Sequence, residues 1–211
     1  NQRKVLVAAI QNQALNRFRV LMQFANLKEP PTEIECFSSI RGVYKEEEKN
    51  IAVIDIGAVS TKLYLANNGL LQRMHRVRAG GVIATKRIAG VLESSFEEAE
   101  IKKRTITKND KDFRDIERAH HSSYERTWQE FRQVIKEYED NLAIKLDAIY
   151  LTGGGSIFPT TRTMAQDILR RDIFPVNTFS KVSYPAFMED MMGDLSPTFH
   201  TALGAALRVF E

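Results

Sequence analysis

Cysteine and long apolar runs are the scarcest features of this 211-residue sequence. Cys36 is the only cysteine, so no disulfide can form within the chain, as is typical of a reducing compartment. Beside Phe37, this thiol is expected to fill a core rather than act as a nucleophile. No apolar run reaches the roughly 18 residues that span a bilayer, so we expect any membrane association to go through a partner.

The sequence also has little net charge. The 30 Lys and Arg residues barely exceed the 27 Asp and Glu residues, and no basic patch with interleaved aromatic residues is present. We therefore expect no nucleic-acid partner. With 43% hydrophobic and 27% charged residues, the composition is typical of a globular protein, and the length suffices for one large domain or two small ones.

A metal-ligating pattern is the third absence. His120 and His121 are adjacent, but no Cys, His or Asp partners recur at a metal-ligating spacing. The pair is therefore predicted to lie on the surface of a helix. A long amphipathic helix is predicted over residues 123–143.

The first 50 residues combine short apolar segments with breaks. Residues 5–10 predict a buried strand, and residues 14–25 a helix that Pro30 and Pro31 bring to an end. We predict a short strand over 32–37, a helix capped by Ser38, and a charged linker into the next strand. Because the sequence does not begin with methionine and enters a strand almost at once, we expect a fragment or a processed product.

The segment 51–65 is the centre of the sequence. A β-branched apolar run predicts a buried strand that ends at Asp55, and a second strand follows before the hairpin turn at 67–69. The turn between the two strands is small and polar, with Gly57, Ala58, Ser60 and Thr61. A carboxylate beside backbone donors and hydroxyls suits a metal-bound phosphate. The alternative is a surface hairpin with a polar turn.

Two further segments carry candidate ligand-binding groups. Gly80 and Gly81 precede a helix over 82–92, where an anion could approach backbone donors; a flexible loop is the alternative. A helix that begins after Ser95 places Glu100 and Lys103 on one face. These two side chains could form a solvated ion pair or hold a ribose.

A glycine-rich turn follows another predicted strand. Residues 148–151 form the strand, and a helix over 161–169 comes next. The turn between them contains Gly153, Gly154, Gly155 and Ser156. Three glycines leave no β-carbon under a flat ring, and open α/β sheets bind ligands at the carboxyl ends of their strands. A close-packed turn without a ligand is the alternative. An edge strand over 174–177 and a helix over 198–210 close the chain.

Taken together, these motifs resemble the actin-like ATPase superfamily, and within it the type IV pilus assembly family PilM and its cell-division relative FtsA. The resemblance covers about residues 3–211, and its order is more specific than any single motif. It is carried by Asp55-Ile56-Gly57-Ala58 with Ser60-Thr61, Gly80-Gly81, Ala99-Glu100 with Lys103, residues 151–156 and the alanine-rich residues 202–208. The turn at 67–69 and the chain's last residues are more similar to PilM than to FtsA.

The resemblance implies an α/β fold, in which an actin-like, ribonuclease-H-like mixed sheet is flanked by helices and lacks its N-terminal phosphate-loop strands. Residues 1–49 would be the remnant of a first lobe with its connecting helix. Residues 50–211 would form a second lobe, with a helical insertion at about 80–120. In such a fold the hairpin holds ATP phosphates and Asp55 orients Mg²⁺. The helix with Glu100 and Lys103 borders the ribose and purine, and the turn at 153–156 lies behind the adenosine.

Two departures from the family pattern bear on activity. The family's first phosphate loop is absent, and Ala58-Val59 stands where strong ATPases carry more glycine. No polarising carboxylate or glutamine is apparent for an attacking water, so we expect at most a weak ATPase. The whole interpretation requires that the turns at Asp55 and Gly154 meet at one cleft.

The function implied is a nucleotide-binding scaffold of the type IV pilus or a related secretion system. Its partner would be the cytoplasmic tail of a PilN-like inner-membrane protein, which would hold it on the cytoplasmic side of that membrane, and self-association is a further expectation. The alternatives are an FtsA-like division protein and an ATP-dependent kinase. A kinase would need a general base, for which Asp112 or Asp115 could be invoked.

Overall fold

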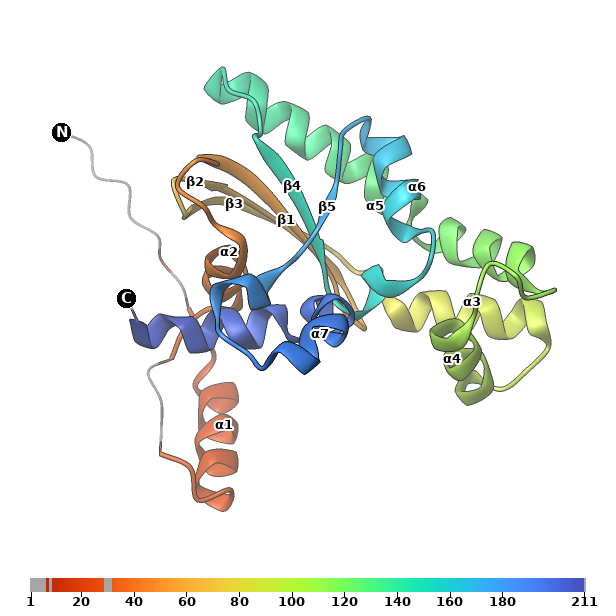
Figure 1. Ribbon diagram of the computed structural model, residues 1–211, viewed down its shortest axis with the longest axis horizontal. Coiled ribbons are helices and arrows are strands. Elements are labelled where there is room, and N and C mark those ends of the chain that lie inside the picture. The colour runs from red at the N-terminus through yellow and green to blue at the C-terminus, as the bar shows by residue number, and fades with distance from the viewer. Residues whose placement is uncertain (1–6, 8, 29–31, 211) are drawn as a thin grey trace. The chain divides into compact units, whose positions relative to one another are not determined.

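The computed structural model describes residues 7, 9–28 and 32–210, which divide into two compact units at residues 33 and 34 (Figure 1). The described part of the first unit contains helix α1, Asn12–Phe24, which confirms the helix predicted over 14–25. Of the strand predicted over 5–10, residues 5, 6 and 8 lie outside the described residues, and residues 7, 9 and 10 are not in a strand. None of the described helices is long and apolar enough to cross a membrane.

The second unit is built on one mixed β-sheet. Its strands are β1 (Asn50–Ile56), β2 (Thr61–Asn67), β3 (Leu70–Val77), β4 (Ala148–Thr152) and β5 (Phe174–Pro175). They lie in the order β3-β2-β1-β4-β5. The first three form an antiparallel meander, whereas β4 is parallel to both β1 and β5. The central hairpin, its turn at Asn68 and Gly69 with positive φ, and the edge position of β5 agree with the sequence prediction.

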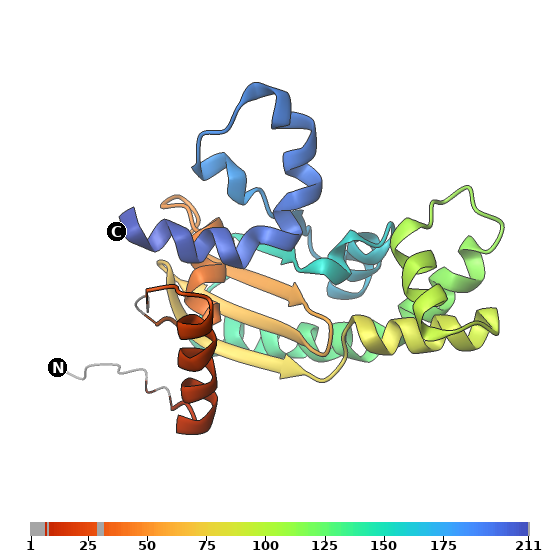
Figure 2. The same cartoon turned by 90° about the horizontal axis from the view of Figure 1, so that it is seen from below.

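Strand β1 is buried on both faces because its residues alternate between two cores. Ile54 and Ile56 face the helices α5 (Phe113–Leu142) and α6 (Thr161–Leu169). Ile51 and Val53 face α2 (Glu35–Val43), which in turn packs against α7 (Glu189–Leu207). Figure 2 shows α5 and α7 on opposite sides of the sheet. A sheet covered on both faces needs continuous apolar runs, which is what the sequence of β1 provides.

A smaller helical group forms a third core. It consists of α3 (Gly81–Leu92), α4 (Phe96–Thr105) and the first turns of α5, and Phe158 from the glycine-rich turn packs into it. Ile88, Ile116 and Phe158 are among its buried side chains. Helix α4 begins with the predicted capping box, in which the Ser95 hydroxyl accepts from the Glu98 N–H and the Glu98 carboxylate accepts from the Ser95 N–H.

Four sequence predictions about elements are wrong. Residues 35–37 belong to helix α2 rather than to a strand, and Ser38 lies inside that helix instead of capping it. Cys36, Ile40 and Val43 recur at helical spacing, and this face of α2 packs on the sheet. Helix α5 starts ten residues before the predicted position 123. Helix α7 starts at Glu189 rather than 198, and it continues through Pro197.

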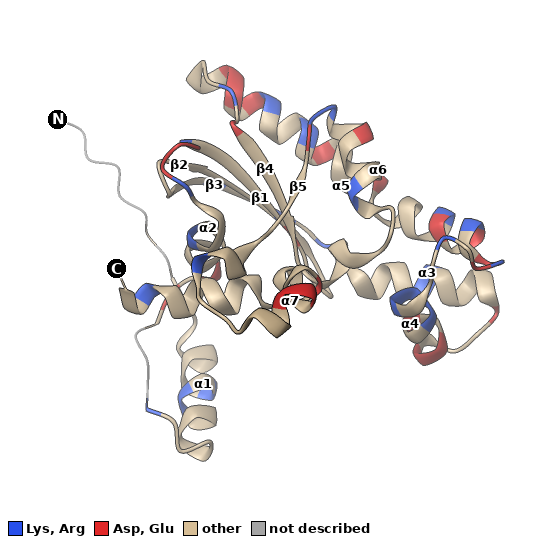
Figure 3. Ribbon diagram, viewed as in Figure 1, with Lys and Arg blue, Asp and Glu red and all other residues tan. Residues whose placement is uncertain are grey.

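Charged residues of both signs occur along α4, α5 and α6 (Figure 3). The strands of the sheet carry few of them (Figure 3).

Candidate functional site

The turn after β1 and the glycine-rich turn after β4 meet at the carboxyl ends of these two neighbouring strands. Asp55 and Thr152 are register partners on the parallel strands β1 and β4, so the segments that follow them leave the sheet side by side. Gly153 has φ of +87°, and a Cβ built on it would lie 2.5 Å from Asp55 Oδ1. A side chain at position 153 would therefore displace the carboxylate as well as strain the backbone.

The hairpin turn also contacts the start of α3. Gly81 N donates to Gly57 O at 3.0 Å, and Val82 N donates to Ala58 O at 2.8 Å. A Cβ on Gly80 would lie 2.5 Å from Gly57 O, so glycine is needed for this approach. Since these helix N–H groups already have carbonyl partners, what Gly81 contributes to the site is backbone surface without a side chain.

Helix α4 contributes a cluster of charged side chains that are hydrogen-bonded to one another. Lys103 Nζ is 2.6 Å from Glu100 Oε2 and 2.7 Å from Thr85 Oγ1, and Arg104 Nε is 2.7 Å from Glu100 Oε1. Burial pushes the pKa of Glu100 upward, but hydrogen bonds from Lys103, Thr85 and Arg104 outweigh it and lower that pKa to about 2. Glu100 is thus an anion held against the Lys103 ammonium group. The predicted ion pair between Glu100 and Lys103 exists.

These segments surround a cavity of about 630 Å³, within the size range of small-molecule sites. Backbone without bulky side chains, charged groups and apolar groups all contribute to its wall. The predicted site residues in the lining are Gly57, Ala58, Gly81, Glu100, Lys103, Gly154 and Gly155. The other lining residues are Ile56, Val82, Phe96, Arg104, Ile106, His120, Tyr124, Ile157, Phe158, Pro159 and Thr198.

The glycines of the second turn serve different purposes. A Cβ on Gly155 would lie 2.2 Å from Ile56 Cγ2, so packing against β1 requires glycine there. A Cβ on Gly154 would meet nothing within 4 Å. The absence of a side chain at Gly154 is therefore not required by the protein's own packing, and it leaves the cavity open.

The remaining predicted site residues lie outside the lining and have internal roles. Thr61 is fully buried and donates its hydroxyl to Ala79 O at 2.6 Å. Ser156 donates its hydroxyl to Gly153 O at 2.7 Å and so stabilises the turn. Ser60 is buried, and its carbonyl accepts from Gly57 N in the hairpin turn.

Asp55 is almost buried beside the cavity, and Lys62 is its nearest cation in the described structure. Lys62 Nζ lies 3.9 Å from Asp55 Oδ2 and 2.5 Å from Glu35 Oε1 on α2. Burial raises the pKa of Asp55 to about 6, against the opposing effect of Lys62. The described residues contain no group of three or more His, Cys, Asp or Glu side chains placed to hold a metal. Asp55 and the adjacent Glu35 are therefore too few for a metal site made by the protein alone, which fits a cation that is held mainly by a ligand.

His120 and Tyr124 were not recognised as cavity residues from the sequence. The prediction that His120 lies on a helix surface is wrong, because the side chain is 1% exposed and its ring stacks on Phe158 with centroids 3.9 Å apart. Burial lowers the pKa of His120 to about 3, so the ring is neutral near pH 7. The signal that could have revealed it is the apolar spacing of Phe113 and Ile116, which continues through 120 and 124.

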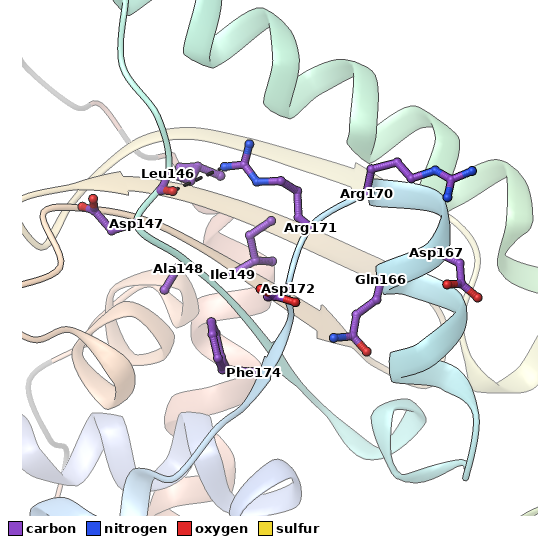
Figure 4. Close-up of a pocket in the computed structure, with 10 residues that line it drawn as sticks. All are labelled: Leu146, Asp147, Ala148, Ile149, Gln166, Asp167, Arg170, Arg171, Asp172 and Phe174. Carbon is purple, nitrogen blue, oxygen red and sulfur yellow. Dashed lines mark hydrogen bonds between the residues drawn. The ribbon is translucent and has the colours of Figure 1, made fainter.

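A second hollow, of about 470 Å³, lies at the opposite end of β4 (Figure 4). Arg171 lines this hollow, but its guanidinium group already has partners within the protein. It donates to Glu139 Oε1 at 2.8 Å and to Leu146 O at 3.3 Å. The Arg170 side chain points away from Arg171 (Figure 4). The hollow therefore offers a ligand less than the cavity at the carboxyl ends of the strands.

Comparison with solved structures supports the fold. The chain matches a chain of the PilM-PilN type IV pilus biogenesis complex with a TM-score of 0.80 and 24% identity, over 94% of this chain and 58% of the other. It matches the ethanolamine utilization protein EutJ from Carboxydothermus hydrogenoformans with a TM-score of 0.66 and 19% identity, over 94% and 62% of the two chains. MreB5 of Spiroplasma citri bound to ADP matches with a TM-score of 0.63 and 11% identity, over 95% and 69%. The predicted actin-like α/β fold is confirmed.

The extent of these matches also matters. This chain spans less than two thirds of the length of the pilus protein and of EutJ. No curated protein matches the sequence. The family model for the type IV pilus assembly protein PilM matches residues 1–210. Because that match covers nearly the whole sequence, the chain belongs to the PilM family of type IV pilus assembly proteins.

Proposed function

We propose that this chain is the nucleotide-binding part of a type IV pilus assembly scaffold that binds ATP in the cavity beside Asp55 and Gly154. The observation that carries the proposal is the convergence of three segments, distant in the sequence, on one cavity of about 630 Å³. Each segment supplies a different chemistry: a small-residue hairpin, an ion pair on a helix, and an open glycine turn.

The lining matches the parts of a nucleotide. Gly154 and Gly155 provide a surface over which a flat purine can lie, and Phe158 and Ile106 add apolar area. The Glu100 carboxylate can accept hydrogen bonds from ribose hydroxyls, and Lys103 can donate to oxygen atoms.

Phosphates would lie beside the hairpin turn, where Gly57 and Ala58 line the cavity and leave room for them. Mg²⁺, when bound, would neutralise phosphate charge, and Asp55 is the carboxylate of the hairpin that could orient it. Thr198 lines the cavity from α7 and brings a hydroxyl from the other side of the sheet. Through this contact, a bound nucleotide would stabilise the position of α7 relative to the hairpin.

Assembly rather than turnover is the proposed role. Neither Asp112 nor Asp115, the bases that a kinase would need, lines the cavity, and the side chain of Asp115 is 62% exposed and paired with Arg118. No feature of the described residues specifically favours the kinase or the FtsA-like alternative. Any hydrolysis would be weak, and nucleotide would act as a stabilising ligand that changes the populations of two conformations.

We propose further that the complete protein binds the cytoplasmic tail of a PilN-like inner-membrane protein. The support is family membership together with the likeness to a protein solved as a PilM-PilN complex. Such binding would hold the protein at the cytoplasmic face of the inner membrane, and self-association there is part of the proposal. A pull-down with the tail peptide, with and without ATP, tests this; no binding in either condition would contradict it.

Filling the cavity from position 154 tests the nucleotide site. Gly154→Val adds a side chain where the protein itself leaves space, so the variant should fold normally and lose the increase in melting temperature that ATP gives the complete protein. Gly90→Val is the matched control, because a Cβ on Gly90 also meets nothing within 4 Å and Gly90 does not line the cavity. If Gly154→Val responded to ATP as fully as the control, the proposed site would be wrong.

A further inference from the structure

His120 is a polar side chain in a largely apolar part of the cavity wall. It lines the cavity together with Phe158 and Ile106. Its ring lies flat on that of Phe158, with centroids 3.9 Å apart and 9° between the planes, and the ring of Tyr124 is 5.0 Å away. Only 1% of the residue is exposed, so bulk water reaches almost none of it.

Packing alone does not explain a histidine at this position. The Nδ1 atom of His120 is buried and has no hydrogen-bond partner among the described residues. Nearly all buried polar atoms in proteins are hydrogen-bonded, and one that is left unpaired destabilises the folded state. A phenylalanine would stack on Phe158 without this cost, as the nearly parallel ring of Phe113 does with centroids 6.2 Å apart. A polar ring in this place therefore indicates a partner in the cavity.

The His120 ring is neutral near pH 7. Burial lowers its pKa to about 3, and the electrostatic effects of His121 and Lys103 act in the same direction. A neutral imidazole has one N–H donor and one nitrogen acceptor. It suits an uncharged polar group of a ligand better than a phosphate, for which a cation is the usual partner.

The place of His120 in the wall favours the base over the other parts of a nucleotide. In the proposed site, the hairpin turn holds the phosphates and the ion pair of α4 holds the ribose. His120 belongs to neither segment. It is stacked on Phe158, which follows the glycine-rich turn where the purine is proposed to lie.

We propose that His120 determines the base specificity of the nucleotide site by accepting a hydrogen bond from the 6-amino group of adenine. This inference rests on the proposed nucleotide site and deepens it, because it assigns recognition of the base to a residue of α5. A ligand without the amino group leaves the buried imidazole unpaired. Sites that hydrogen-bond a substrate group discriminate strongly against analogues that lack it, for this reason.

The measurement that tests this is a calorimetric titration of the complete protein with ATP and with purine riboside triphosphate, which is ATP without its 6-amino group. The wild type should bind ATP about tenfold more tightly or better, as expected for one hydrogen bond to a buried group. His120→Phe keeps a ring that can stack on Phe158 but has no acceptor. It should bind the two ligands within about twofold of each other, with its affinity for the analogue unchanged.

His121→Phe is the matched control. His121 is the next residue on α5, and its Nε2 lies 2.9 Å from Thr160 Oγ1, but it does not line the cavity. This variant should keep the full preference for ATP. If it lost the preference as His120→Phe does, the effect would come from the stability of α5, and the inference would be wrong.

Thermal unfolding without nucleotide gives an independent check. His120→Phe removes an unpaired polar atom, so its melting temperature should equal or exceed that of the wild type, whereas ATP should raise it less. A clearly lower melting temperature of the variant without nucleotide, with its preference for ATP unchanged, would mean that the imidazole has its partner within the protein, and would overturn the inference.

Nitrogen-15 NMR of the wild type covers the case in which His120→Phe does not fold. A hydrogen bond to the unprotonated ring nitrogen shifts its resonance, so saturating ATP should move a ring-nitrogen resonance of His120 and saturating purine riboside triphosphate should not. Equal shifts with both ligands, or none with ATP, would contradict the inference.

The remaining outcomes separate the inference from the proposed function. Equal affinity of the wild type for ATP and the analogue contradicts the inference and leaves the nucleotide site intact. An equal loss of affinity for both ligands in His120→Phe assigns a structural role to His120 and also contradicts the inference. A wild type that binds neither ligand contradicts the proposed function and, with it, the role of His120.

Discussion

Asp55 and Gly153 are in contact at the carboxyl ends of two parallel strands, although 98 positions separate them in the sequence: a Cβ at position 153 would come within 2.5 Å of Asp55 Oδ1. This contact is what turns a polar hairpin and a glycine-rich turn into one site. The geometry of the site therefore requires a residue without a side chain at position 153.

Gly153→Ala should therefore destabilise the protein. The alanine would have to adopt φ near +87° and would collide with Asp55 and Ile56, which together should lower the free energy of unfolding by about 2 kcal/mol or more. Denaturant unfolding measures this. Gly154→Ala is the control, since a Cβ there meets nothing within 4 Å, and equal stabilities of the two variants would contradict the geometry described for Gly153.

Replacing Glu100 should reduce nucleotide affinity through the ribose. Glu100→Gln removes the charged acceptor, and losing a hydrogen bond to a charged group costs about 1.5–3 kcal/mol, which corresponds to roughly a tenfold to hundredfold weaker Kd. Calorimetric titration with ATP and with 2′-deoxy-ATP checks the assignment. If Glu100 contacts the 2′-hydroxyl, the loss from the variant and the loss from the deoxy sugar should not add.

The control for that measurement lies two residues earlier on the same helix, on a different face. Glu98→Gln keeps a side chain able to complete the capping box with Ser95, and it should leave affinity unchanged. An equal loss of affinity in Glu98→Gln and Glu100→Gln would mean that the effect comes from the stability of α4 and not from contact with the ligand.

Lowering the pH should weaken the packing of α2 against α7, because His200 between them becomes protonated. The ring is 1% exposed, Nε2 donates to Ser39 O at 2.8 Å, and the Thr178 hydroxyl donates to Nδ1. Burial lowers the pKa of His200 to about 4, below the roughly 6.5 of an unfolded histidine. The unfolded state then binds the proton first, so this residue's contribution to stability is present above pH 6.5 and is lost as the pH falls towards 4.

At about 1.4 kcal/mol per pH unit, the contribution of His200 is on the order of 3 kcal/mol. His200→Gln keeps a donor and an acceptor but does not titrate, so its free energy of unfolding should fall less than that of the wild type between pH 6.5 and 4. Urea unfolding at a series of pH values measures the difference, and parallel curves for the two proteins would contradict the assignment.

Local sequence signals were enough to predict the elements that surround the cavity. The β-branched run before Asp55, the positive-φ turn at Asn68-Gly69 and the capping box at Ser95 are each specified within a few residues, and the structure contains all three. The glycine turn was equally visible. The prediction that these segments form one site came from the order of the motifs, which resembles that of the actin-like superfamily.

Features that depend on distant packing were not predictable in the same way. The first residues of α2, 35–37, were taken for the end of a strand because Glu33 and Glu35 alternate with apolar residues. Their helical form depends on the packing of α2 against α7, where a Cβ on Gly204 would lie 2.0 Å from Ser38 O. The burial of His120 depends on Phe158, 38 positions later. The pairing of Lys62 with Glu35 depends on the packing of α2 against the sheet.

Hydrogen exchange of the complete protein with and without ATP tests the central claim most directly. Our account predicts that ATP slows exchange in peptides that cover residues 56–58, 100–104 and 153–158, and that exchange at 146–149 and 166–174, around the second hollow, is unchanged. Protection confined to that hollow, or no protection at any of these segments at saturating ATP, would contradict it.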